Sequence, residues 1–186
     1  THKLDSEILL SKVLKISREK LLMNLNQKVE AQKIIYFNKL VNRRSSKEPV
    51  AYILQEKEFW SKIFFVNKNT LIPRPETEIM VEKIVKIFKR KSISILDIGT
   101  GTGCILLSIL SELKNSKGIG IDISSKAIKI ANINSEKNNL ISRTKFYRKS
   151  LLEIYNQYFD LIVSNPPYIM RRDLKNLDDD IKNLHD

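Results

Sequence analysis

Residues 93–104 read ISILDIGTGTGC, and this stretch decides the fold of the chain. The apolar run at residues 93–96 predicts a buried strand, and residues 104–110 carry the apolar pattern of a helix. The loop at residues 97–103 places three glycines between the two elements, so the main chain can approach a ligand without side chains in the way. A strand, a glycine turn and a helix N-terminus together form a site for a nucleoside-bearing ligand. The stretch therefore predicts an α/β fold with such a site at the end of a parallel strand.

Glycine is concentrated around this predicted site. The chain has 5 glycines; three of them lie within residues 99–103, and the other two flank Ile119 in the next predicted strand, residues 118–121. That strand ends at Asp122, 23 positions after Gly99. An acidic side chain in this place can accept hydrogen bonds from ribose hydroxyls. The second strand thus supplies a further candidate for ligand binding.

A second motif, Asn165-Pro166-Pro167-Tyr168, follows an apolar run at residues 159–164 that predicts another buried strand. The two prolines have no N–H for the sheet ladder, so they direct the chain out of the sheet. The amide of Asn165 and the carbonyl of Pro166 are then acceptors at the carboxyl edge of the sheet, where open α/β sheets bind ligands. Two acceptors suit a substrate –NH2 group. Taken alone, the motif fits a proline-terminated loop equally well, and the glycine loop decides for the functional interpretation.

Composition limits the class of protein. The 186 residues suffice for one to one and a half domains, and no apolar run is long enough to predict a membrane span. Cys104 is the only cysteine, which suits a reducing cytoplasm, and we interpret it as a small packing residue rather than a nucleophile. The formal net charge of +12 comes largely from abundant lysine. Without interleaved arginine and aromatic residues, it predicts no specific nucleic-acid surface.

The first third of the chain contains no glycine and has helical periodicity. We expect helices near residues 4–16, 18–22 and 29–41 and a short one after Pro49, which together form a small bundle over residues 1–56. Residues 58–66 are aromatic and β-branched, and the turn signal at residues 67–69 follows them, so residues 57–75 should hold a hairpin and a linker. The third domain, residues 76–186, should carry parallel strands near 93–97, 118–122, 144–148 and 159–164.

Two kinds of nucleotide chemistry compete for the glycine loop. An NAD site has the spacing G-x-G-x-x-G, whereas this loop reads G-x-G-x-G and follows Asp97. In this form it resembles motif I of the class I S-adenosylmethionine-dependent methyltransferases. The motif at residues 165–168 resembles the one with which amino-methyltransferases of that superfamily hold a planar –NH2 acceptor. We therefore favour a methyltransferase over a dehydrogenase.

Further segments narrow the resemblance. Residues 49–53 (PVAYI), 58–60 (EFW) and 71–78 (LIPRPETE), followed by the glycine loop and residues 165–168, match one family in this order. The chain resembles the protein-(glutamine-N5) methyltransferases that modify peptide chain release factors. The likeness covers nearly the whole chain, and the PRPETE segment discriminates best against the sister enzyme that acts on a ribosomal protein. The implied fold is a Rossmann-like methyltransferase sheet preceded by a helical bundle that recognises the protein substrate.

The resemblance also implies roles for individual residues. S-adenosylmethionine would lie across the carboxyl edge of the sheet, with Asp122 on its ribose and with Ile123 and Leu151 flanking its adenine. A glutamine amide would enter opposite the methyl group, Asn165 and Pro166 would accept its two hydrogens, and Tyr168 would pack against its plane. No metal is implied. The cofactor residues are Asp97, Gly99, Thr100, Gly101, Thr102, Gly103, Asp122, Ile123, Leu151 and Asn165; the catalytic residues are Asn165, Pro166 and Tyr168; the substrate-binding residues are Asn165, Pro166, Pro167 and Tyr168.

Two positions depart from the family pattern. Gln55 stands where a glycine is usual, which affects a turn, and Ser150-Leu151 replaces an acidic-aromatic pair, which affects the expected adenine contact. Three other functions stay open: a ribosomal-protein glutamine methyltransferase, a nucleic-acid amino-methyltransferase holding a flipped base, and a cofactor-binding fragment without activity. Sheets of this superfamily have seven strands and only four are predicted here. We therefore expect the chain to be a piece of a longer protein whose C-terminal part is missing.

Overall fold

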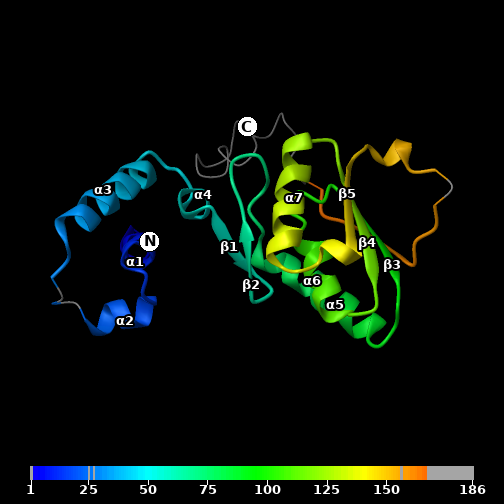
Figure 1. The fold of residues 1–186 in the computed structure, drawn as a ribbon, viewed down its shortest axis with the longest axis horizontal. Coiled ribbons are helices and arrows are strands. Elements are labelled where there is room, and N and C mark those ends of the chain that lie inside the picture. Colours follow the sequence, from blue (N-terminus) through cyan, green and yellow to red (C-terminus); the bar gives the residue numbers. More distant parts are fainter. Residues whose placement is uncertain (1, 25, 27, 156, 167–186) are drawn as a thin grey trace.

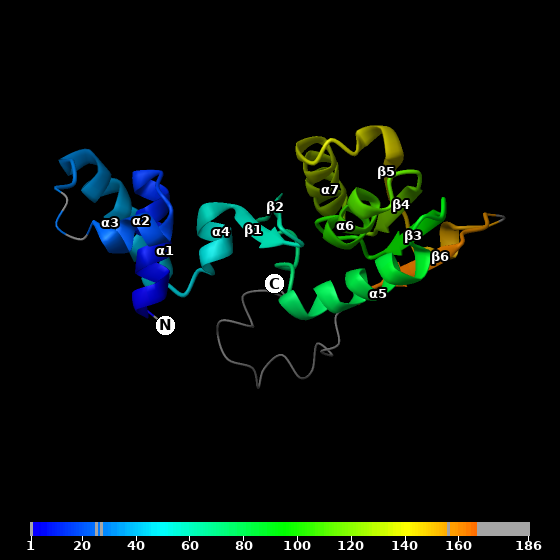
Figure 2. The same cartoon turned by 90° about the horizontal axis from the view of Figure 1, so that it is seen from below.

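The computed structural model describes residues 2–24, 26, 28–155 and 157–166. The helices of the first third lie at one end, a β-hairpin lies in the middle, and a sheet with its helices lies at the other end, as Figures 1 and 2 both show. The predicted fold class, a helical N-terminus followed by a Rossmann-like sheet of parallel strands, is confirmed. No helix of the described part is long and apolar enough to cross a membrane.

Four helices precede the hairpin: α1 (His2–Leu14), α2 (Arg18–Met23), α3 (Ala31–Ser45) and α4 (Val50–Leu54). Ser17 caps α2, because its side chain accepts a hydrogen bond from the backbone N–H of Lys20 at 3.3 Å. Helix α3 begins two residues later than expected and extends to Ser45. The small core of this region consists of Leu9, Val13, Leu40 and Ile53, with Phe37, Val41, Val50 and Leu54 packed against it.

The hairpin pairs β1 (Glu56–Phe59) with β2 (Lys62–Phe65) in antiparallel register. The chain reverses at Trp60 and Ser61, which have φ values of 52° and 53°, and not at the predicted turn signal, which forms a separate turn after β2. Positive φ at both turn residues matches the twist of a two-residue hairpin loop, although such loops usually contain glycine or asparagine. Glu78 and Glu112 hold Trp60 in place: its backbone N–H donates to Glu78 Oε1 at 2.9 Å and its indole N–H to Glu112 Oε1 at 3.0 Å.

The sheet contains β3 (Ser94–Ile98), β4 (Lys117–Asp122), β5 (Thr144–Arg148) and β6 (Leu161–Ser164), close to the four predicted strands. All pairs are parallel, in the order β5-β4-β3-β6. The chain moves outward from β3 to β5 and then returns to the other side of β3. The strand order therefore reverses between β3 and β6. Open α/β sheets bind ligands at the carboxyl ends of the strands at such a point.

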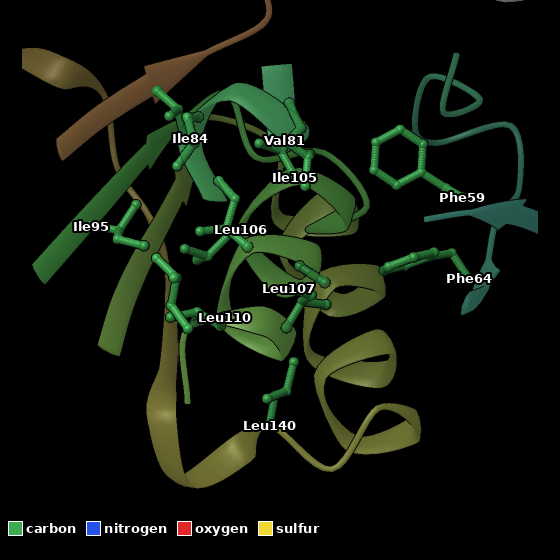
Figure 3. Close-up of a cluster of buried hydrophobic side chains, with 14 of the residues drawn as sticks. Phe59, Phe64, Val81, Ile84, Ile95, Ile105, Leu106, Leu107, Leu110 and Leu140 are labelled. Atoms are coloured by element: carbon green, nitrogen blue, oxygen red, sulfur yellow. The ribbon is translucent and has the colours of Figure 1, made fainter. Parts of the chain in front are cut away.

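Helices α5 (Glu78–Phe88), α6 (Cys104–Glu112) and α7 (Ser125–Lys137) accompany the sheet, together with short 3-10 turns at Pro75–Thr77 (η1), Ile141–Arg143 (η2) and Leu151–Glu153 (η3). Figure 3 shows side chains of α5 and α6 meeting those of the sheet, with the hairpin residues Phe59 and Phe64 reaching the same core. The two rings pack edge to face, with their centroids 6.1 Å apart. The hairpin therefore shares a hydrophobic core with the sheet.

Candidate functional site

The glycine loop folds back onto the end of β4. The backbone N–H groups of Gly99 and Thr100 both donate to the carbonyl of Ile121 at 2.9 Å, and that of Gly103 donates to the carbonyl of Thr100 at 2.7 Å. The three loop glycines have φ values of 70°, 53° and 78°, which favour glycine over residues that carry a Cβ. A Cβ added at Gly99 would meet no atom within 4 Å. One side of the loop backbone is therefore open to a ligand.

The two glycines of β4 allow the elements around the same site to pack closely. A Cβ at Gly120 would lie 2.5 Å from the Phe146 ring and 2.8 Å from Thr100 Oγ1, and a Cβ at Gly118 would lie 2.4 Å from Leu106 Cδ1. Real side chains do not approach so closely, so these glycines let the loop and α6 pack directly on the sheet. All five glycines of the chain thus shape this site.

Asp97 lies buried beneath the loop, with 1% of its surface exposed. Thr100 Oγ1 donates to its Oδ2 at 2.7 Å, but its Oδ1 has no hydrogen-bond partner within the described residues. Burial raises the pKa of Asp97 to about 6; the hydrogen bond from Thr100 opposes this rise, and the charge of Asp122 adds to it. A cationic ligand group near the loop would stabilise the ionised carboxylate.

Asp122, at the end of β4, braces the loop. Its Oδ2 accepts a hydrogen bond from the backbone N–H of Gly101 at 3.0 Å, and its Oδ1 accepts one from that of Ser124 at 2.9 Å. Each carboxylate oxygen can accept a further hydrogen bond, so these contacts leave room for a ligand hydroxyl. The sequence predicted the acidic residue but not this second role in holding the loop.

The other predicted cofactor residues divide by exposure. Ile123 and Leu151 follow the neighbouring strands β4 and β5 and expose 75% and 54% of their surface, which leaves apolar side chains available to a flat ring. Thr100 and Thr102 instead bury their side chains, and the Thr102 hydroxyl accepts a hydrogen bond from Cys104 N at 3.4 Å. These two threonines can therefore meet a ligand mainly through their backbone.

Cys104 packs against the core at the start of α6. Removal from water raises the pKa of its thiol to about 12, mainly by disfavouring the charged thiolate. A thiol that stays neutral at physiological pH is a poor nucleophile. This environment favours the interpretation of Cys104 as a packing residue. Within the described residues, no group of histidine, cysteine, aspartate and glutamate side chains could hold a metal ion.

Asn165 lies beside the glycine loop because β6 pairs with β3. Ser164 is the register partner of Ile98, and its hydroxyl donates to the carbonyl of Ile98 at 3.0 Å. The next residue, Asn165, is half-buried and donates from its Nδ2 to Thr77 Oγ1 at 3.3 Å. Pro166 is exposed. The remaining predicted substrate residues, Pro167 and Tyr168, lie outside the described residues.

Asn134 on α7 was not predicted from the sequence, and it is completely buried. Its Oδ1 accepts from Phe65 N at 2.6 Å, and its Nδ2 donates to the carbonyls of Phe65 at 3.0 Å and Thr102 at 2.9 Å. One side chain therefore joins the hairpin to the glycine loop. The signal was present in the sequence: Asn134 falls on the same helical stripe as the apolar residues Ala127, Ile130 and Ala131.

Comparisons with known proteins match both parts of the chain. Residues 1–54 match the family described as PrmC N-terminal domain, and residues 75–181 match the family described as methyltransferase small domain. A release factor glutamine methyltransferase from Buchnera aphidicola subsp. Acyrthosiphon pisum is 44% identical over 179 residues, which cover 96% of this chain and 64% of that protein. A protein of the same name from Caulobacter vibrioides is 35% identical, over 96% of this chain and 63% of that protein.

Two other matches have different names. A bifunctional methyltransferase from Rickettsia typhi is 42% identical over 186 residues, which cover 89% of this chain and 36% of that protein. Among solved structures, a human methyltransferase 10 domain containing protein has a TM-score of 0.49 and 20% identity, over 65% of this chain and 61% of that chain. The chain spans less than two thirds of the length of each of these proteins.

Proposed function

Since the chain belongs to the methyltransferase small domain family, we propose that it transfers a methyl group from S-adenosylmethionine to the side-chain amide nitrogen of a glutamine in peptide chain release factors. The observation that carries this proposal is the position of Asn165. It follows β6, next to the glycine loop that follows β3, at the point where the strand order reverses. A cofactor in the loop and an amide at Asn165 would therefore be neighbours. Translation termination takes place in the cytoplasm, where we expect the protein to act.

The loop residues fit S-adenosylmethionine, which supplies an electrophilic methyl carbon on a sulfonium when bound. The open backbone at Gly99 gives its methionine and ribose portions close access. The unpartnered oxygen of Asp97 favours a ligand that carries positive charge, as this cofactor does. Asp122 retains lone pairs for ribose hydroxyls beyond the two backbone groups that it already holds. Ile123 and Leu151 would cover the adenine with their exposed side chains.

The chemical problem at the substrate is a weak nucleophile. The lone pair of an amide nitrogen is conjugated with its carbonyl, so the nitrogen reacts only when it is well oriented. Asn165 Oδ1 and the carbonyl of Pro166 would accept its two hydrogens and direct the lone pair at the methyl carbon. Orientation of this kind can contribute roughly 7–11 kcal/mol to lowering a barrier. The proton is acidic after transfer, so no general base is required before it. We propose that Tyr168, with Pro167 beside it, packs against the amide plane.

The helical region would recognise the protein substrate beyond its glutamine. Its matching family is described as PrmC N-terminal domain, and its helices keep several large apolar side chains exposed, among them Ile34, Ile35 and Met23. Exposed apolar side chains next to a catalytic domain suit a protein partner better than a small molecule. We therefore propose that residues 1–56 contact the release factor, while residues 76–186 form the catalytic domain.

The test is mass spectrometry of a purified release factor after incubation with the protein and a labelled methyl donor. A single added methyl group on a glutamine side chain is the expected result. A ribosomal-protein substrate and DNA or RNA serve as competitors. Preferential labelling of either one would replace the proposed substrate with that alternative. Cofactor binding without labelling of any substrate would identify a binding protein without activity.

Two variants separate the proposed roles. Asp122→Ala should weaken cofactor affinity about 10- to 100-fold, because it removes hydrogen bonds to a charged group. Asn165→Ala should keep most of the cofactor affinity and abolish methyl transfer, because its oxygen serves the substrate. Calorimetry with the cofactor and a turnover assay measure the two effects. An equal loss of cofactor binding in both variants would show that the division of roles is wrong.

A further inference from the structure

Thr77 lies at the junction of η1 and α5, and its side chain does not cap the helix. Its φ of −70° and ψ of −19° are helical, whereas a capping residue normally has an extended backbone. The Thr77 side chain therefore makes no hydrogen bond to the first turn of α5. Its Oγ1 instead accepts the hydrogen bond from Asn165 Nδ2 at 3.3 Å, although the two residues are 88 positions apart. The hydroxyl thus serves the residue proposed to hold the substrate amide.

The direction of this hydrogen bond matters for the chemistry. A substrate –NH2 group needs an acceptor, and only the Oδ1 side of the asparagine amide can accept. If the amide turned by half a rotation, its own –NH2 group would face the substrate –NH2 group, and two donors would meet. In the structure the Thr77 hydroxyl accepts from Nδ2 and so anchors the Asn165 side chain in the orientation in which Oδ1, not Nδ2, is on the side away from Thr77. We propose that Thr77 is a positioning residue that anchors the Asn165 side chain in this orientation for substrate binding, an inference that rests on the proposed function.

The segment around Thr77 is well suited to hold that orientation. Pro73 is buried, Pro75 begins the 3-10 turn η1, and Thr77 N donates to the carbonyl of Arg74 at 3.1 Å. The next residue, Glu78, accepts the hydrogen bond from Trp60 N in the hairpin turn. Adjacent residues of one rigid turn therefore contact the hairpin and Asn165. The PRPETE segment, which the sequence analysis used only as a family marker, acquires a physical role in the site.

The test compares three variants. Thr77→Val keeps the shape of the side chain but removes the acceptor, so the turnover number should fall about 10- to 100-fold, as expected for a misoriented substrate. The dissociation constant of the cofactor should stay unchanged. Thr77→Ser keeps the oxygen and should recover most of the turnover. Thr70→Val is the matched control, because the buried hydroxyl of Thr70 has no hydrogen-bond partner among the described residues; it should leave turnover unchanged.

Three outcomes would overturn the inference: full turnover in Thr77→Val, an equal defect in Thr77→Ser, or a loss that follows cofactor affinity. A second measurement does not depend on turnover. In 15N NMR spectra, the side-chain –NH2 resonances of Asn165 should shift in Thr77→Val and stay in place in Thr70→Val. Unchanged resonances in both variants would also overturn it. If the unmodified protein labels no release factor, the proposed function fails, and the NMR comparison alone decides the role of Thr77.

Discussion

Helix α6 is buried at every position from Ile105 to Ser111, whereas the longer helix α3 buries only Leu40. The first helix packs inside the large core shared by the sheet and the hairpin, and the second belongs to the small core of the N-terminal helices. Helical stability in proteins comes mainly from packing of an apolar face. Packing therefore contributes more to the stability of the sheet region than to that of the helical region. The sheet region can accommodate the glycine loop and a buried charge, while the helices keep apolar side chains exposed.

Polar interactions divide in the same way. In the sheet region, fully buried polar side chains such as Asn134 join separate elements. In the helical region, the ion pairs Arg18–Glu7, Arg43–Glu48 and Arg44–Asp5 lie at or near the surface. Surface ion pairs contribute only about 0–1 kcal/mol each. We therefore expect substitutions in the sheet region to lower the free energy of unfolding more than substitutions in the helical region. This difference can be tested at defined positions.

The largest effect is expected from the same substitution made in the two cores. Leu107→Ala, in the core around α6, should lower the free energy of unfolding by about 4–5 kcal/mol, and Leu40→Ala by about 2–3 kcal/mol, because the tighter core collapses less around the cavity. Chemical denaturation monitored by circular dichroism measures both values. Equal losses would contradict the proposed difference between the two cores. Cofactor affinity, measured alongside, should fall in Leu107→Ala and stay unchanged in Leu40→Ala.

A smaller loss is expected from Asn134→Leu. The substitution removes the partners of three backbone groups, two part-buried ones on Phe65 and a buried one on Thr102, and should cost about 3–4 kcal/mol of stability. Asn132→Leu on the same helix is the matched control, because Asn132 is exposed and its side chain donates to the carbonyl of Ile128 within its own helix. It should change stability by less than about 0.5 kcal/mol. Similar stability in the two variants would mean that Asn134 does not join the hairpin to the loop.

The features that the sequence predicted are local ones. The strand and glycine loop at residues 93–103 carry their own periodicity and turn chemistry, and all four predicted parallel strands are confirmed to within a few residues. Asp122 was identified because it ends a strand at a fixed distance from the loop. Such features depend on residues that are close in the chain, so pattern and spacing are sufficient to find them.

The features that the sequence did not predict depend on distant partners. The reversal at Trp60 and Ser61 contradicts local turn preference, and hydrogen bonds from Trp60 to Glu78 and Glu112 accompany it. The contact between Thr77 and Asn165 spans 88 positions and exists only because β6 pairs with β3. Helix periodicity could have flagged Asn134 as buried, but not its partners. Tertiary structure decided each of these cases.

Asp97→Asn should increase stability, in contrast to the substitutions above. Asp97 has a pKa of about 6 in the folded protein and 3.8 as its ordinary value. Below pH 3.8 the group is protonated in both states, and the cost of burying its charge grows as the pH rises to 6, reaching about 3 kcal/mol. The asparagine –NH2 group lacks a ready acceptor, so we expect a net gain of about 2 kcal/mol at pH 7.5. Denaturation at pH 7.5 and pH 4 should show this gain shrinking with acidification.

Asp160→Asn is the control of opposite sign. The carboxylate of Asp160 is exposed and accepts hydrogen bonds from the backbone N–H and the hydroxyl of Ser94, which lower its pKa. Its contribution to stability is therefore present at neutral pH and lost as the pH falls. A stability difference between Asp97→Asn and the unmodified protein that did not vary with pH would exclude a buried charge as its cause. Asp97→Asn should also bind the cofactor more weakly. That result would show that the buried carboxylate, although it lowers stability, is needed for cofactor binding.

The smallest effect is expected at Gln55, which lies between the helices and the hairpin. Gln55 follows the last residue of α4 with φ 56° and ψ 29°, a left-handed conformation in which a Cβ is unfavourable. Its backbone N–H still closes the helix by donating to carbonyls of α4, and its carbonyl accepts from Val66 N at 3.3 Å. The conformation is thus fixed by contacts on both sides. It gives a physical reason for the glycine that the family pattern has at this position.

Gln55→Gly should stabilise the protein by about 0.5–1 kcal/mol, since relief of the left-handed strain exceeds the entropy that glycine loses on folding. Gln55→Ala is the control, because it keeps the Cβ and should give no gain. Thermal denaturation followed by the fluorescence of Trp60 reports on the hairpin, and circular dichroism reports mainly on the helices. A gain seen only by circular dichroism would show that the helices unfold on their own. An equal gain by both probes would mean that the helices and the hairpin unfold together as one cooperative unit.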